Sequence, residues 1–152
     1  QIPGVAAAYG PLFGLGIVDA PAGLSVSALN LFNLEVEIGF VMGSTLEPRD
    51  EPFGHDEVWA AVKEVVLSLE ICGKRHKIDT PPSNLIGLAD CSSAGGVVCG
   101  KRFTTAQVTP EQLRDVATEL VVNGVSVVKG VGSNVSIAHP CARGCACSCA
   151  VG

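Results

Sequence analysis

Residues 33–40 read NLEVEIGF, a stretch in which apolar and polar residues alternate. Side chains two positions apart in a β-strand project from the same face, so this alternation predicts a strand over residues 34–42. The apolar residues at the even positions would lie on one face. Glu35 and Glu37 would lie on the other, about 6–7 Å apart along the strand. The predicted strand therefore has one apolar face and one acidic face.

Two interpretations of the acidic face are open. A solvated face needs no further explanation, because glutamate side chains are normally exposed. A binding site would need a third acid. Glu70 is a candidate because it lies near the end of a second predicted strand, residues 65–71, which is apolar and in which burying a lone carboxylate is costly. Three carboxylates in one cleft would repel one another. A hard divalent cation such as Mg²⁺, Mn²⁺ or Ca²⁺ would remove that repulsion.

Short strands and turns dominate the rest of the predicted fold. The chain contains 18 Gly and 9 Pro, which is high for a helical bundle, and its β-branched residues recur in short runs between turns. The pair Asn123-Gly124 predicts a hairpin over residues 118–128, because it favours a two-residue type I′ turn. Short helices are expected at residues 55–64 and from Thr109 onward. The fold class is therefore predicted to be α+β and β-rich.

The composition and charge argue against several classes of function. The chain has 152 residues, which suits one domain, and 47% of them are hydrophobic, which is enough for a core. Its net charge is −5, and its basic run at residues 74–77 is interpreted as a solvated turn, so no nucleic-acid partner is expected. The apolar runs are shorter than the ~20 residues that cross a bilayer. Residues 1–23 are interpreted as loops and turns without a signal-peptide pattern, so we expect no membrane contact and a cytoplasmic location.

The seven cysteines fall into two groups. Three are scattered in apolar segments and are interpreted as reduced core thiols, namely Cys72, Cys91 and Cys99. The other four lie in CARGCACSC, residues 141–149. Their spacing lacks the two-residue gaps of zinc sites, so residues 141–152 are predicted to form an irregular tail rich in Cys, Ala and Gly. A thiol-metal binding protein that uses this tail is an alternative.

Five ordered segments of the chain resemble the fumarylacetoacetate hydrolase superfamily, and within it the 2-keto-4-pentenoate (2-hydroxypenta-2,4-dienoate) hydratases. The segments read QIPGVAAAYGPLFG, EVEIGFVMG, SLEICGKRHKID, GLADCSSAGGVVCG and KGVGSNVSIAHP. The resemblance implies an incomplete mixed β-roll or barrel of short strands with few helices over residues 1–140. It also implies that Glu35, Glu37 and Glu70 hold Mg²⁺ or Mn²⁺.

The resemblance further implies a lyase that adds water to a 2-hydroxy-2,4-dienoate and yields a 4-hydroxy-2-oxo acid. A small 2-oxo or 2-hydroxy dienoic acid is therefore the expected substrate. Asp79 and Asp90 are candidates for supporting catalytic roles, although each also fits a loop cap or a turn. Ser133, in a glycine-rich stretch, is a candidate substrate contact. Exposed strand edges in a partial chain would favour a homo-oligomer.

Departures from the family pattern keep other functions open. Ala8 stands where the family has an acid, Cys91 stands where it has an asparagine, and the family's catalytic lysine would precede Gln1. The chain is therefore expected to be the middle part of a longer enzyme. The alternatives are a metal-dependent 2-oxo-acid decarboxylase on the same scaffold, a C–C bond hydrolase, and a catalytically inactive metal-binding relic.

Overall fold

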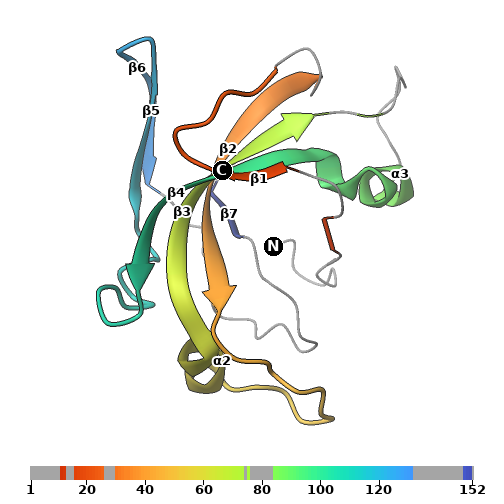
Figure 1. The fold of residues 1–152 in the computed structure, drawn as a ribbon, viewed down its shortest axis with the longest axis vertical. Coiled ribbons are helices and arrows are strands. Elements are labelled where there is room, and N and C mark those ends of the chain that lie inside the picture. Colours follow the sequence, from red (N-terminus) through yellow and green to blue (C-terminus); the bar gives the residue numbers. More distant parts are fainter. Residues whose placement is uncertain are drawn as a thin grey trace. The chain divides into compact units, whose positions relative to one another are not determined.

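The computed structural model describes residues 11–12, 16–25, 30–73, 75, 84–131 and 149–151, and the fold is given for these. The strands are β1 (Gly16–Asp19), β2 (Leu31–Met42), β3 (Val62–Gly73), β4 (Ala94–Thr104), β5 (Ala117–Val122), β6 (Val125–Val131) and β7 (Cys149–Val151). The helices are α2 (His55–Ala61), α3 (Asn84–Ala89) and the 3₁₀ helix η1 (Cys91–Ser93). Five strands form a sheet in the order β1-β4-β3-β2-β7, and β5 and β6 form a two-stranded sheet (Figure 1). The predicted β-rich α+β class is confirmed.

The contacts within the chain define two compact units, residues 1–35 with 68–100, and residues 36–67 with 101–152. In the first unit, β1 runs parallel to β4, in a register that pairs Gly16 with Gly96. The Ala20 N–H extends this pairing by donating to the Cys99 carbonyl oxygen at 2.8 Å. The prediction of loops throughout residues 1–23 is therefore wrong at β1. Its hydrogen-bonding partner lies far along the chain, and local composition carries no information about it.

The second unit has its core around Ile38 on β2 and Val65 on β3, which are 2% and 0% exposed. Val62 and Leu113 complete the buried cluster. Phe40, on the same face of β2 as Ile38, packs edge-to-face against Trp59 of α2, with ring centroids 6.4 Å apart. The even positions of β2 therefore supply the apolar face that the alternation predicted.

The connection from β2 to β3 differs from its predicted boundaries. The helix expected over residues 55–64 ends at Ala61, and β3 begins at Val62. Val62 is buried, and a β-branched side chain at that position packs better in a strand than in a helix. The helix expected from Thr109 is a series of turns, in which the Gln112 N–H donates to the Thr109 carbonyl oxygen at 3.1 Å. Three-residue spacing of such bonds closes turns rather than an α-helix.

The β5–β6 hairpin was predicted from one pair of residues, and the structure confirms it. Leu120 pairs with Val128 across the hairpin, and the register shifts between Leu120 and Val121. Asn123 has φ of 52° and Gly124 has φ of 80°, so both turn residues occupy the left-handed region that a type I′ turn requires.

None of the helices in the described part of the chain has the length and apolar character to cross a membrane. Residues 141–148 lie outside the described residues. Cys149–Val151 form β7, which pairs antiparallel with β2 in a register that sets Glu37 opposite Ala150.

Candidate metal centre

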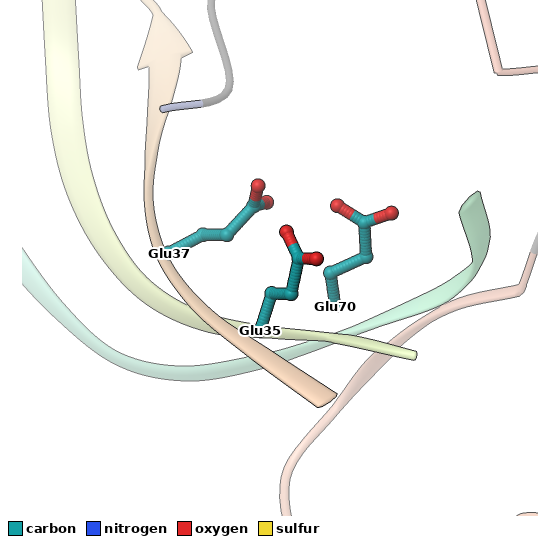
Figure 2. A group of neighbouring side chains, drawn as sticks. All are labelled: Glu35, Glu37 and Glu70. Carbon is teal, nitrogen blue, oxygen red and sulfur yellow. The ribbon is translucent and has the colours of Figure 1, made fainter. Parts of the chain in front are cut away.

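Neighbouring strands of the sheet bring three carboxylates together. Glu35 and Glu37 are two positions apart on β2, so their side chains leave the strand on the same face. Glu70 comes from β3, which lies beside β2 in the sheet. One carboxylate oxygen from each residue lies within 4.8 Å of those of the other two. Figure 2 shows the three side chains directed toward one another.

Burial distinguishes this cluster from an ordinary acidic surface. Glu37 is 4% exposed, and Glu35 and Glu70 are half-buried. Ile38, the next residue on β2, is 2% exposed, so the strand is covered on both faces at this point. The interpretation of a solvated acidic face therefore does not hold for Glu37. The Asn33 amide donates a hydrogen bond to Glu35 Oε1 at 3.2 Å, which supplies one neutral donor to the cluster.

The donor set fits a hard divalent cation. All three groups offer oxygen, which Mg²⁺, Mn²⁺ and Ca²⁺ prefer over nitrogen or sulfur. Two oxygens bound to one such ion lie roughly 3–5 Å apart, because metal–oxygen distances are about 2.0–2.6 Å. The separation of up to 4.8 Å among the three carboxylates matches that range. Glu35, Glu37 and Glu70 are thus suited to hold the cation as a group.

Of the other three candidate site residues, Asp90 lies in the part of the chain that the structure describes. Asp90 directly follows α3, and its carboxylate Oδ1 forms an ion pair with Arg75 Nε at 2.9 Å. Its side chain is 6% exposed, so the carboxylate is held inside the α3–β4 connection rather than in the glutamate cluster. Asp79 and Ser133 lie outside the described residues. Cys72 is buried, as predicted for a core cysteine, whereas Cys91 and Cys99 are half-buried.

Arg75 is the residue whose role the sequence did not reveal. It lies in the basic run at residues 74–77, which was interpreted as a solvated turn. The structure instead engages its guanidinium with Asp90 and with the Ala94 carbonyl oxygen, the latter at 2.6 Å from Nη1. A buried acid elsewhere in the chain is the signal that such an arginine has a partner. The sequence alone does not say which acid is buried.

The fold is similar to the fumarylacetoacetate hydrolase-like fold that the resemblance implied. Two similar solved structures are of 4-oxalocrotonate decarboxylase from Pseudomonas putida G7, a member of that superfamily. The complex with magnesium and adipate aligns with a TM-score of 0.58 at 20% identity, over 91% of this chain and 57% of that one. The complex with calcium and acetate aligns with a TM-score of 0.56 at 20% identity, over 91% and 56%.

These likenesses show the fold, and this chain spans little more than half the length of those enzymes. No family model matches the sequence. No curated protein matches it either.

Proposed function

We propose that this chain carries the metal centre of a lyase that acts on a small 2-oxo or 2-hydroxy dienoic acid. Glu35, Glu37 and Glu70 would be the protein ligands of Mg²⁺ or Mn²⁺. The observation that carries the proposal is the approach of three carboxylate oxygens to within 4.8 Å, with Glu37 buried. The magnesium and calcium complexes of the structurally similar decarboxylase support a divalent cation on this scaffold.

The reaction that we propose first is hydration of a 2-hydroxy-2,4-dienoate to a 4-hydroxy-2-oxo acid. When bound, the cation would act as a Lewis acid toward the carboxylate and 2-oxygen of the substrate. The three glutamates would hold and orient it. Burial of Glu37 would keep water from that side of the site. Asp79 stays a candidate for a supporting catalytic role and Ser133 for substrate contact, whereas Asp90 is engaged by Arg75.

Decarboxylation of a 2-oxo acid is the second candidate reaction. The observation that favours it is that the two solved structures compared above are both of a decarboxylase. The same three glutamates would serve either reaction, so they do not separate the two. A metal-binding relic without turnover is the third possibility. The cytoplasmic location and the homo-oligomer expected from the sequence stay predictions.

Calorimetric titration of the metal-stripped protein with Mn²⁺ tests the metal centre. We expect one site per chain, with affinity at least about tenfold weaker in Glu37→Gln, because the amide removes one anionic ligand. The matched control is Glu47→Gln, which changes an exposed acid in the loop after β2 and should leave the affinity unchanged. Absence of a saturable site, or equal affinity in both variants, would contradict the proposal.

Product analysis separates the candidate reactions. The Mn²⁺-loaded protein is incubated with 2-hydroxypenta-2,4-dienoate and, separately, with 4-oxalocrotonate, and the products are followed by NMR. A 4-hydroxy-2-oxo acid formed from the first substrate supports the hydratase. Carbon dioxide release from the second supports the decarboxylase. Stoichiometric metal binding with neither product supports the relic.

A further inference from the structure

We propose that Arg75 and Asp90 are a positioning pair for Glu70. They would fix the end of β3 to the α3–β4 connection and thereby hold the Glu70 carboxylate against the other two. This inference rests on the proposed metal function, because the pair would hold a proposed metal ligand, Glu70, in position. Neither residue would touch the cation.

Arg75 joins three parts of the first unit through one side chain. It lies two residues after the end of β3 at Gly73, and its Nε pairs with Asp90 Oδ1 at 2.9 Å. Its Nη1 donates to the Ala94 carbonyl oxygen at 2.6 Å, and its Nη2 donates to the Asp90 carbonyl oxygen. The Arg75 backbone N–H also donates to Asp90 Oδ1, at 3.3 Å. The exit of β3 is thus connected to the end of α3 and to the start of β4.

Burial increases the strength of this connection. The Asp90 side chain is 6% exposed and that of Arg75 is 44% exposed, so the carboxylate end of the pair is shielded from water. A buried carboxylate needs its cationic partner, and removing one member of such a pair is far more costly than breaking a surface ion pair. Arg75 is therefore held to Asp90 more firmly than the exposed ion pairs of this chain are held.

A close backbone contact fixes β3 from the β4 side, next to Glu70. A Cβ added to Gly95 would lie 2.7 Å from the carbonyl oxygen of Ile71, the residue that follows Glu70. Only glycine allows that approach. Ile71 and Cys72 are 5% and 3% exposed, so the strand is packed on both sides of the contact. The β3 backbone beside Glu70 therefore has little freedom while β4 stays in place.

The turn at residues 90–93, which Arg75 contacts through the Asp90 carbonyl oxygen, has an uncommon backbone conformation. Cys91, Ser92 and Ser93 have φ values of 51°, 54° and 72°, in the left-handed region that residues other than glycine rarely adopt. Such a conformation persists where its surroundings determine it. Here the Ser93 N–H donates to the Asp90 carbonyl oxygen at 2.9 Å, and Arg75 donates to that same oxygen. Loss of Arg75 would release this turn and, with it, the start of β4.

Repulsion within the glutamate cluster explains why the end of β3 needs support from Arg75 and Asp90. Like charges within 4.8 Å repel, so each carboxylate tends to move away from the others until a cation binds. A ligand set works when its supporting residues hold it near the bound geometry beforehand. Glu35 and Glu37 share one strand, but Glu70 comes from another strand and depends on how the end of β3 is held. The Arg75–Asp90 pair supplies that support.

The test uses the double variant Arg75→Gln/Asp90→Asn, because replacing both members leaves no unpaired buried charge. The matched control is Arg102→Gln, which breaks the Arg102–Glu64 ion pair of 3.3 Å on the first half of β3. We expect the double variant to bind Mn²⁺ about tenfold more weakly than wild type, and the control to bind within about twofold of it. Thermal unfolding without metal, measured in parallel, tests whether both variants are folded.

Several outcomes would overturn the inference, and they differ from failure of the proposed function. If wild type binds no Mn²⁺, the proposed metal function fails and the positioning role fails with it. If wild type binds and the double variant binds equally well, only the positioning role fails. It also fails if Arg102→Gln weakens Mn²⁺ binding as much as the double variant does. The affinity would then depend on any interaction lost along β3, and not on the Arg75–Asp90 pair.

A conservative variant covers the case in which the double variant does not fold. Arg75→Lys keeps the charge opposite Asp90, but its single nitrogen cannot reproduce the three contacts that separate guanidinium nitrogens make with Asp90 Oδ1 and with the carbonyl oxygens of Ala94 and Asp90. We expect it to bind Mn²⁺ about threefold more weakly than wild type, between wild type and the double variant. Wild-type affinity in a folded Arg75→Lys protein would overturn the inference.

Discussion

Glu35 on β2 and Glu70 on β3 bring carboxylate oxygens to within 4.8 Å of each other. Two unit charges at such a separation repel by about 3–4 kcal/mol at an effective dielectric constant of 20. Glu37, which is 4% exposed, adds a third carboxylate to the group. The metal-free protein therefore holds a repulsive arrangement, and a divalent cation would convert it into an attractive one.

Glu70→Gln should weaken the stabilisation that Mg²⁺ gives to the folded protein. A ligand at about 100 times its dissociation constant stabilises the folded state by about 2.7 kcal/mol, and we expect this gain for wild type. The variant should gain less than half as much, because it loses one anionic ligand. Without metal it should be at least as stable as wild type, because one like charge is gone. Thermal unfolding with and without Mg²⁺ measures both effects.

Glu64→Gln is the control for this prediction. Glu64 lies on the same strand and pairs with Arg102, outside the cluster. Its replacement should leave the gain from Mg²⁺ unchanged. Equal gains in wild type and Glu70→Gln would mean that the metal, if it binds, does not use Glu70.

Gly95→Ala should destabilise the fold by about 1–3 kcal/mol, because an added side chain overpacks a tight contact. The new Cβ would lie 2.7 Å from the Ile71 carbonyl oxygen, so β3 and β4 would have to separate beside Glu70. Urea unfolding measures the loss. Gly87→Ala in α3 is the control, because no atom of the described residues lies within 4 Å of a Cβ added there. It should be neutral or stabilising by about 0.5–1 kcal/mol, as expected for a helix interior. A Gly95→Ala protein of wild-type stability would contradict the close approach.

Glu57→Gln should reduce stability at neutral pH and have no effect in acid. Glu57 Oε2 accepts hydrogen bonds from Arg49 Nη2 at 2.8 Å and from the Gly54 N–H at 2.7 Å. The Arg49 hydrogen bond, and after it that of Gly54, lowers the pKa of Glu57 below its ordinary value of 4.5. A lowered folded-state pKa contributes stability above the ordinary pKa, and this contribution disappears as the pH falls through the lowered value.

The measurement for Glu57 is urea unfolding at pH 7 and near pH 2, since the contribution vanishes below both pKa values. Arg49→Gln and the combined variant complete a double-mutant cycle. We expect coupling between the two residues at pH 7 and none in acid. Coupling of the same size at both pH values would show that the ionised carboxylate is not its source.

Gly124→Ala should destabilise the β5–β6 hairpin by about 1 kcal/mol, because φ near +80° is unfavourable for a residue with a Cβ. Amide hydrogen exchange at Leu120 and Val128, which pair across the hairpin, reports the local effect. Asn123→Gly is the control, because Gly accepts the φ of 52° found at that position. Unchanged protection in Gly124→Ala would mean that the turn can adopt another type.

Local patterns predicted the parts of the fold that depend on neighbouring residues. Alternation around Glu35 and Glu37 predicted β2, and the pair Asn123-Gly124 predicted the β5–β6 hairpin. The same patterns missed β1, whose hydrogen-bonding partner is β4, a distant segment. They also placed the start of β3 too late, because the choice between helix and strand at Val62 depends on the core that it joins.

The sequence by itself determined that the chain is β-rich and that Glu35 and Glu37 leave one strand on the same face, because a period of two is a property of the strand alone. It also singled out Glu70 as an acid in an apolar strand. Only the tertiary structure decided that the three carboxylates meet, that Glu37 is buried, and that Arg75 is paired with Asp90. Each of these facts depends on which strands lie side by side, and strand order is set by contacts between segments far apart in the chain.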